Sequence, residues 1–235
     1  MRFIAKVFDF GDVIGHFNWR RACFSWHSWH NTCMRNPKAN TSAEPGHKAQ
    51  ISEREIRDAL LMLLSESSND GVRIQEELRL ERGSARIDVA VIGSSLVGYE
   101  IKSDADTFAR FANQIHAYNR IFDEIHLVCG ERHLEAAKAT IPSWWGIFVA
   151  RRADDGDVVI SLVRAANPNS RQDSFSLASM LWRDEALAMI DTATANVPKK
   201  ASSHMLWEHI ASTFSLEAIR STVSHTLLRR PLTPF

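Results

Sequence analysis

Apolar residues follow two different spacings along residues 52–129. In Ser52–Leu64 they recur every three or four positions, which predicts an amphipathic helix with Ser52 as its N-cap. Strand-like alternation or apolar runs occupy residues 72–80, 86–92, 96–102 and 124–129. A second helix is predicted to open at Asp104, with an apolar face made of Phe108, Phe111, Ala112, Ile115 and Phe122. The predicted order is therefore helix, three strands, helix and strand.

The rest of the chain divides into a sheet extension and a helical part. Two apolar segments, 146–150 and 158–163, flank an acidic turn and predict a hairpin that extends the sheet. The tandem Trp144-Trp145 before it is expected to pack in the core. Helical spacing is found at 132–139, 175–190, 204–214 and 216–228, with Ser215 as an N-cap. The pattern predicts an α/β domain over residues 48–165 and a small helical subdomain over residues 172–235.

Residues 1–47 show no sustained periodicity, and we expect them to form a poorly ordered or weakly structured extension. Four potential zinc ligands lie within this stretch: Cys23, His27, His30 and Cys33. No loop separates them into two ligand pairs, as it does in familiar zinc fingers. A zinc site there is therefore an alternative to the extension.

The hairpin formed by residues 86–102 carries the candidate chemistry. A turn centred on Ser94 makes one face apolar by pairing Ile87 with Ile101, Val89 with Tyr99, and Val91 with Val97. The same register places Asp88 directly opposite Glu100, with Lys102 on their side of the hairpin. The β-carbons of directly opposed residues lie about 4.5–5.5 Å apart, and like charges at this distance destabilise a sheet, so a cation is expected between the two carboxylates. Oxygen ligands suit Mg²⁺ or Mn²⁺. The alternative is a solvated Glu100–Lys102 pair on an exposed face.

Asp88 followed by Glu100-Ile101-Lys102 resembles the signature of the PD-(D/E)XK nuclease superfamily, with Ile87 where a proline often precedes the aspartate. The resemblance implies an αβββαβ restriction-endonuclease-like core with a mixed central sheet. It also implies a Mg²⁺-dependent endodeoxyribonuclease that hydrolyses phosphodiesters. Holliday-junction resolvases of this superfamily carry a further acidic residue on the first helix, which here is Glu53 or Glu55. Helical geometry favours Glu53, because it lies beside the apolar stripe.

The resemblance assigns a role to each candidate residue. Asp88, Glu100 and Glu53 would be catalytic and would ligate the metal together with the Ile101 carbonyl. Lys102 would assist the attacking water or stabilise the transition state, and it is expected to support no core contact. Gln114 and Tyr118, four residues apart on the second helix, would position the substrate. The alternative from another class is a nucleic-acid or protein-binding module that has this fold and no turnover.

Composition narrows the partners and the compartment. The formal net charge of the 235 residues is +0, so the whole chain lacks the basic excess of many nucleic-acid-binding proteins. Lys and Arg exceed Asp and Glu by seven to three in residues 1–50 and by five to two in residues 198–235, and these flanks suit phosphate contacts. DNA is the expected partner, and RNA stays open as the alternative nucleic acid. Pairing of the chain with a second copy of itself, as a homodimer, is also left open. Three cysteines and the lack of a long apolar segment predict a cytoplasmic protein that does not engage a membrane.

Overall fold

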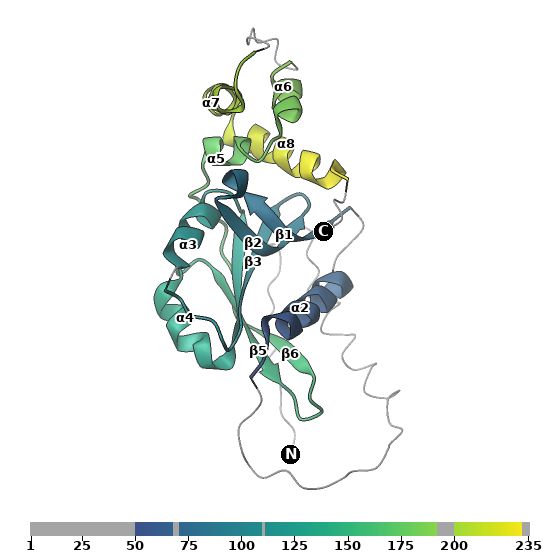
Figure 1. Cartoon of the computed structure of the whole chain (residues 1–235), viewed down its shortest axis with the longest axis vertical. Helices are drawn as coiled ribbons and strands as arrows, with labels where there is room; N and C mark the ends of the chain where they lie inside the picture. Colours follow the sequence, from purple (N-terminus) through teal and green to yellow (C-terminus); the bar gives the residue numbers. More distant parts are fainter. Residues whose placement is uncertain (1–49, 68–70, 110, 192–199, 232–235) are drawn as a thin grey trace.

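The computed structural model describes residues 50–67, 71–109, 111–191 and 200–231 (Figure 1). These residues form an α/β fold, which confirms the predicted class. The strands are β1 (Arg73–Leu80), β2 (Ala85–Ile92), β3 (Leu96–Lys102), β4 (Glu124–Gly130), β5 (Gly146–Arg152) and β6 (Val158–Arg164). The helices are α2 (Glu53–Ser67), α3 (Phe111–Asn119), α4 (Leu134–Thr140), α5 (Ser174–Ala178), α6 (Arg183–Asp191), α7 (Ser203–Thr213) and α8 (Leu216–Arg229).

The six strands form one sheet in the order β1-β2-β3-β4-β5-β6. The pairs β3–β4 and β4–β5 are parallel, and the other neighbouring pairs are antiparallel, so the sheet is mixed. Parallel neighbours need a crossover connection, which α3 and α4 provide. The hairpin predicted downstream is present as β5 and β6, and it extends the sheet as expected.

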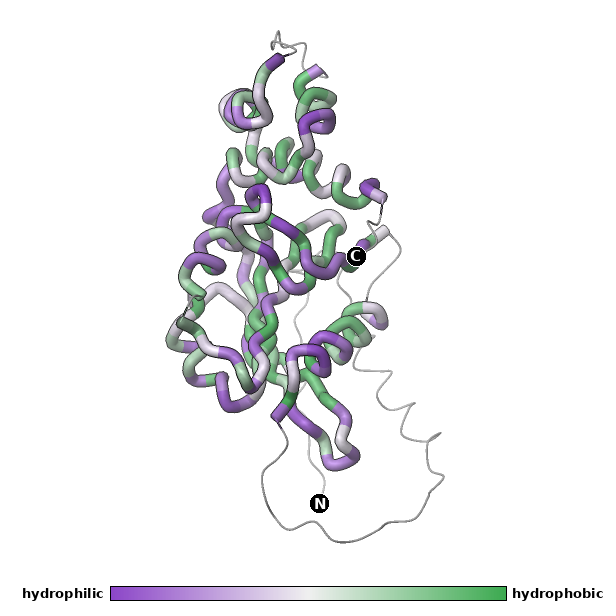
Figure 2. Tube along the Cα trace, in the orientation of Figure 1, coloured by the Kyte–Doolittle hydropathy of each residue, from purple (hydrophilic) through white to green (hydrophobic). Residues whose placement is uncertain are grey.

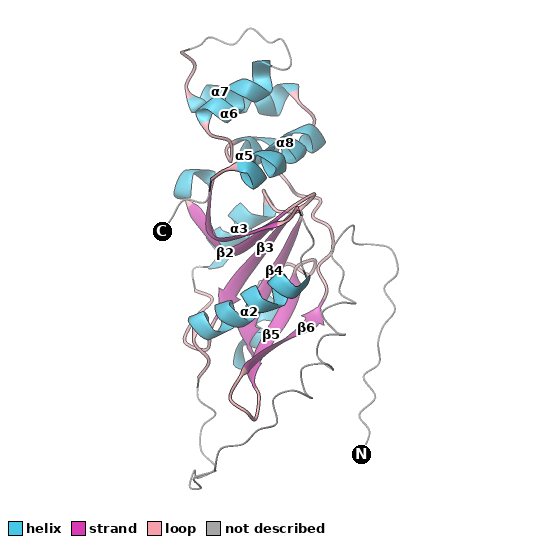
Figure 3. Ribbon diagram, turned by 90° about the vertical axis from the view of Figure 1, so that its right-hand side faces the viewer, coloured by secondary structure: helices cyan, strands magenta, loops and turns pink. Residues whose placement is uncertain are grey.

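Helices cover both faces of this sheet (Figures 1 and 3). On one face α2 buries Ile56, Leu60 and Leu64 in a core that includes Tyr99 and Phe148. On the other face lie α3 and α4, over the second core. That second core continues without interruption into α5–α8, which sit at one end of the sheet. Figure 2 shows hydrophobic residues concentrated along the central strands and hydrophilic ones at the tip of the β5–β6 hairpin.

The start of α2 follows from a reciprocal pair of hydrogen bonds, which confirms Ser52 as the N-cap. The Ser52 hydroxyl accepts from the Glu55 amide at 3.3 Å, and the Glu55 carboxylate accepts from the Ser52 amide at 2.9 Å. Because of the Ser52 amide and then the Arg152 guanidinium, the pKa of Glu55 is lowered to about 2. Glu55 is therefore committed to the helix cap and to Arg152.

Two predicted helices differ from those observed. The helix predicted from Asp104 begins at Phe111, since the Asp106 carboxylate accepts from the Ser103 amide at 2.8 Å and closes a turn before it. Ala112 was predicted to lie on the apolar face of this helix, but it is exposed. Phe122 is buried as expected, but it lies beyond the end of α3. The single helix predicted at 175–190 is two helices, α5 and α6. The Glu185 carboxylate accepts from the Trp182 amide at 2.6 Å, which starts a new helix there.

Two smaller predictions are confirmed. The Ser215 hydroxyl accepts from the Ala218 amide at 3.2 Å and caps α8. Trp145 is fully buried, and its indole N–H donates to the Asn119 side chain at 2.8 Å, so it packs in the core. The predictions for residues 1–47, including Cys23, His27, His30 and Cys33, lie outside the described residues. Among the described helices, none has the length and apolar character needed to cross a bilayer.

Candidate cation site between α2 and the β1–β2–β3 edge

Strands β1 and β2 both change face at one level, between the pairs Glu76–Val89 and Leu78–Ile87. Val89 packs in the core under α2, whereas Ile87 packs in the core on the opposite face. In a regular strand these two residues would share a face. The prediction that Ile87 and Ile101 complete one apolar face is therefore wrong. Glu77, at the same level of β1, has φ of 54°, a left-handed conformation that non-glycine residues rarely adopt.

Because of this change of face, Asp88 lies outside the regular backbone pairing of β2 with β3. Backbone pairing between β2 and β3 runs from Val89–Tyr99 to Ile92–Leu96, which confirms the predicted register about Ser94. Next to the Val89–Tyr99 pair, Asp88 Oδ2 accepts from the Ile101 amide at 2.7 Å. The Asp88 carboxylate thus holds the two strands together where the backbone ladder stops.

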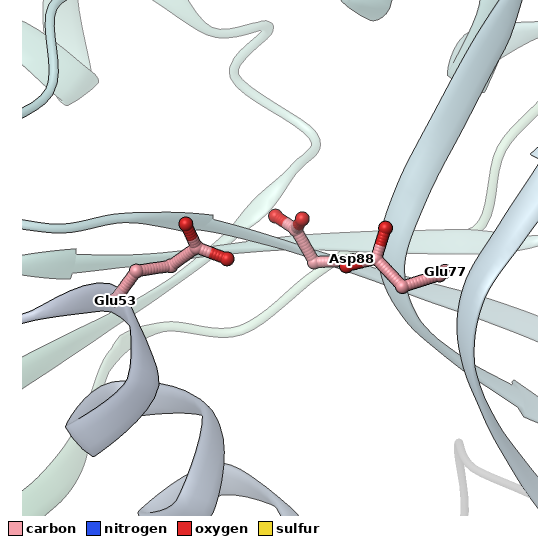
Figure 4. Close-up of side chains that lie close together, drawn as sticks. All are labelled: Glu53, Glu77 and Asp88. Atoms are coloured by element: carbon pink, nitrogen blue, oxygen red, sulfur yellow. The ribbon is translucent and has the colours of Figure 1, made fainter. Parts of the chain in front are cut away.

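Three carboxylates from three elements converge beside this point. The structure places Glu53 at the start of α2, Glu77 on β1 and Asp88 on β2, with one oxygen of each within 4.8 Å of the others. Figure 4 shows the Glu53 side chain reaching from the helix toward the two strand residues. Sequence reasoning missed Glu77, because alternation in Gln75-Glu76-Glu77 does not reveal a left-handed residue.

Arg57 of α2 supplies positive charge to this carboxylate cluster. Its Nη2 lies 2.5 Å from Glu53, 2.8 Å from Glu77 and 3.3 Å from Asp88. Its Nη1 donates to the Asp88 carbonyl oxygen at 3.0 Å. The Arg57 side chain is only 13% exposed. A protein cation therefore already neutralises Glu53 and Asp88, two of the three carboxylates that were expected to bind a metal ion.

Glu100, the second predicted carboxylate, lies in a hydrogen-bond network of its own and is 2% exposed. Its Oε1 accepts from Lys102 Nζ at 2.7 Å and from Gln114 Nε2 at 2.9 Å. Its Oε2 accepts from the Tyr118 hydroxyl at 2.8 Å, and that hydroxyl also lies 2.5 Å from the carbonyl oxygen of Arg86. The predicted residues Glu100, Lys102, Gln114 and Tyr118 are thus all in contact.

Burial raises the proton affinity of both carboxyl groups, and a neighbouring like charge adds to this effect at Asp88. Desolvation and then the neighbouring Glu100 charge raise the pKa of Asp88 to about 7. Burial is also the main cause that raises the pKa of Glu100, against the opposing effect of Lys102. Burial followed by the Glu100 charge raises the pKa of Tyr118, so its hydroxyl stays protonated and can donate. Near neutral pH, Asp88 is therefore poised between its neutral and charged forms.

This pKa predicts how stability depends on pH. Asp88 titrates near 3.8 when unperturbed and at about 7 in the folded protein, so the folded state holds this proton more tightly. The resulting stabilisation is complete below about pH 4 and is lost as the pH rises through about 7. We expect the stability of the wild type relative to Asp88→Asn to fall over this range, in urea unfolding with EDTA present. A difference that stays constant from about pH 4 to pH 8 would contradict the raised pKa.

The donor set fits a hard divalent cation. Carboxylate oxygens are the ligands that Mg²⁺ and Mn²⁺ prefer, and Glu53, Glu77 and Asp88 offer three at suitable spacing. Arg57 Nη2 occupies the same space, so a cation would have to displace it.

The fold and the site define an α/β protein with a mixed six-stranded sheet and a clustered carboxylate site at one sheet edge. Comparison with known families then identifies it: the model of the bacteriophage P4 protein cII family matches residues 46–231, and the chain belongs to that family. Protein cII of Enterobacteria phage P4 is 24% identical over 181 residues, which are 77% of this chain and 68% of that protein. No solved structure matches the chain.

This family corrects the interpretation of the Asp88 and Glu100-Ile101-Lys102 motif. The assignment to the PD-(D/E)XK nuclease superfamily is wrong, and so are the predicted phosphodiester hydrolase activity and the Mg²⁺-dependent endodeoxyribonuclease, because the matching family is that of phage P4 protein cII. The structure supplies a physical reason. The motif was interpreted as requiring a metal ion, yet Arg57 and Lys102 already neutralise Asp88 and Glu100.

Proposed function

We propose that this protein binds DNA at a site where Glu53, Glu77 and Asp88 hold a divalent cation, Mg²⁺ or Mn²⁺. The observation that carries the proposal is the convergence of their carboxylate oxygens within 4.8 Å. Mg²⁺ is usually held by one or two carboxylates, with water and a phosphate completing its coordination. A bound cation would therefore attract a phosphate of the DNA backbone. The Ile101 carbonyl, expected as a further ligand, stays a prediction.

Arginines beside the cluster support a phosphate partner. Arg79 and Arg86 are directly opposed on β1 and β2, and both are exposed. Like charges in such a pair destabilise a sheet, and an anion between them relieves the repulsion. Arg86 Nε lies 2.6 Å from Glu77, so this arginine pair adjoins the carboxylate cluster. Phosphate groups could thus contact the cation and the arginines together.

In this proposal, the side chains that donate hydrogen bonds to Glu100 hold its carboxylate in place. Lys102, Gln114 and Tyr118 fix the Glu100 carboxylate, whose charge contributes to the raised pKa of Asp88. A cation at Asp88 would favour the deprotonated carboxylate and lower that pKa. Cation binding and proton release from Asp88 are thereby coupled.

We also propose that α2, β1, β2, β3, α3 and β4 have the αβββαβ arrangement of a restriction-endonuclease-like core. Their order along the chain supports it, as do the parallel pairing of β3 with β4 and the crossover by α3. This concerns the arrangement of elements alone, because a shared core does not imply a shared function.

Calorimetric titration with Mn²⁺ tests the cation site. We expect the wild type to bind Mn²⁺, and Asp88→Asn to bind at least about ten-fold more weakly, since it loses one of three charged ligands. Asp58→Asn, on an exposed part of the same helix, should match the wild type. No Mn²⁺ binding by the wild type at millimolar concentrations would refute the site.

Fluorescence anisotropy with labelled duplex DNA tests the partner. Affinity should rise when Mg²⁺ replaces EDTA at constant ionic strength, and Asp88→Asn should lose that rise. The same titration with an RNA of matched sequence shows whether the protein binds DNA more tightly than RNA. If the affinity for DNA is the same in Mg²⁺ and in EDTA, the cation has no part in DNA binding.

A further inference from the structure

The two edges of the sheet differ in how they are protected. The β1 edge carries charged residues, is irregular at Glu77, and is tied to the helical part by Arg73, whose Nη1 donates to the Leu227 carbonyl at 2.9 Å. Charge and irregularity are common ways to prevent an edge strand from pairing with another chain. The β1 edge is therefore blocked.

Among the residues that the structure describes, little of this protection is found at the β6 edge. Its sequence from Val158 to Arg164 contains a single charged residue. Its exposed apolar side chains are Val159, Leu162 and Val163, which are 45%, 47% and 42% exposed. Seven residues at roughly 3.3 Å each give an edge on the order of 23 Å long. Such an edge presents backbone donors and acceptors together with an apolar surface.

The apolar pattern of β6 is self-complementary. If two copies of β6 run antiparallel with Ser161 opposite Ser161, Val159 of each copy faces Val163 of the other. Ile160 then faces Leu162 in the same way. Every exposed apolar residue of the strand thus gains an apolar neighbour, and such cross-strand pairs stabilise a sheet.

The charges favour the same antiparallel arrangement. The turn before β6 is acidic and exposed, and it ends at Asp157. Arg164, at the other end of β6, donates to the carbonyl oxygens of Trp145 at 2.7 Å and of Pro142 at 3.1 Å. Antiparallel pairing brings the acidic turn of one copy to the end of β6 that carries Arg164 in the other, whereas parallel pairing would bring the two acidic turns together.

We propose that two copies of this chain pair antiparallel through β6, with Ser161 on the two-fold axis, to form one continuous sheet. The proposal does not depend on the cation site or on DNA binding. Figure 3 shows β6 at the border of the sheet, with α2 across one face of the sheet. Helix α2 contacts β6 on that face, where Val158 and Ile160 pack against the core under the helix. The site of Glu53, Glu77 and Asp88 lies toward the opposite edge, so a dimer would present two such sites.

A pair of charge variants of the full chain tests this register. In Val159→Lys with Val163→Lys, each lysine faces a lysine of the other copy, so the dimer dissociation constant should rise by at least about ten-fold. In Val159→Glu with Val163→Lys, each glutamate faces a lysine, so the dimer should persist. Both variants place two charges on exposed positions and should fold alike, which circular dichroism would check. Met62→Lys, at an exposed position of α2, is the control.

Sedimentation equilibrium across a range of concentrations gives the readout. A dimeric wild type, a weakened Lys/Lys variant and a retained Glu/Lys variant would support the proposal. A wild type that stays monomeric would overturn it. Equal dissociation of both double variants would overturn the Ser161-centred register, and dimers unaffected by either would place the interface elsewhere.

Discussion

Lys102→Ala is expected to lower the free energy of unfolding by about 3–5 kcal/mol at pH 7, because it removes one partner of a buried ion pair. Lys102 Nζ lies 2.7 Å from Glu100 Oε1, and the side-chain exposures of the two residues are 13% and 2%. Without the lysine, the Glu100 charge would face only the neutral donors Gln114 and Tyr118. Urea unfolding followed by tryptophan fluorescence measures the change.

The expected loss contradicts the view that Lys102 supports no core contact. Its ammonium group also lies 5.0 Å from the centre of the Phe111 ring, so it packs against α3. The cost should shrink as the pH falls, because the pKa of Glu100 is already raised by burial and a protonated Glu100 needs no counter-charge.

The double variant Glu100→Gln with Lys102→Met separates the charge effect from the packing effect. It removes both charges and keeps the side-chain volumes similar, so its loss should be smaller than that of Lys102→Ala. If Lys102→Ala unfolds at the same urea concentration as the wild type, the pair contributes nothing to stability.

Local patterns predicted much of the site's framework. The turn about Ser94 and the apolar residues on either side of it fixed the β2–β3 register, because a slip by one residue would move Val89 and Tyr99 out of the core under α2. Helical spacing placed Gln114 and Tyr118 on one side of α3, where both contact Glu100. These features depend on neighbours in sequence or on a single hairpin.

The rest of the site depends on contacts between distant segments. Arg57 reaches Asp88 from 31 residues away, and Glu77 joins the cluster only through a left-handed residue within β1. Neither feature has a periodic signature in the sequence. The nuclease interpretation failed at this point, because it treated two opposed carboxylates as unneutralised and so required a metal ion to explain them.

Arg57→Gln is expected to separate the role of the arginine in folding from its competition with a cation. Without divalent cations at about pH 8, the variant should lose about 2–3 kcal/mol of stability, a value reduced for the partial exposure of the cluster. Glu53, Glu77 and Asp88 would then repel one another without the Arg57 guanidinium that lies among them. Chemical denaturation in EDTA measures this loss.

Cation binding should change in the opposite direction. Arg57 Nη2 occupies the space among the three carboxylates, so its removal should tighten Mn²⁺ binding, and saturating Mn²⁺ should restore much of the lost stability. Arg54→Gln is the matched control, since Arg54 lies on the same helix with a side chain that is 91% exposed. Weaker Mn²⁺ binding by Arg57→Gln would show that the arginine and the cation do not share a site. Tighter binding with recovered stability would identify Arg57 as the residue that occupies the site until a metal ion displaces it.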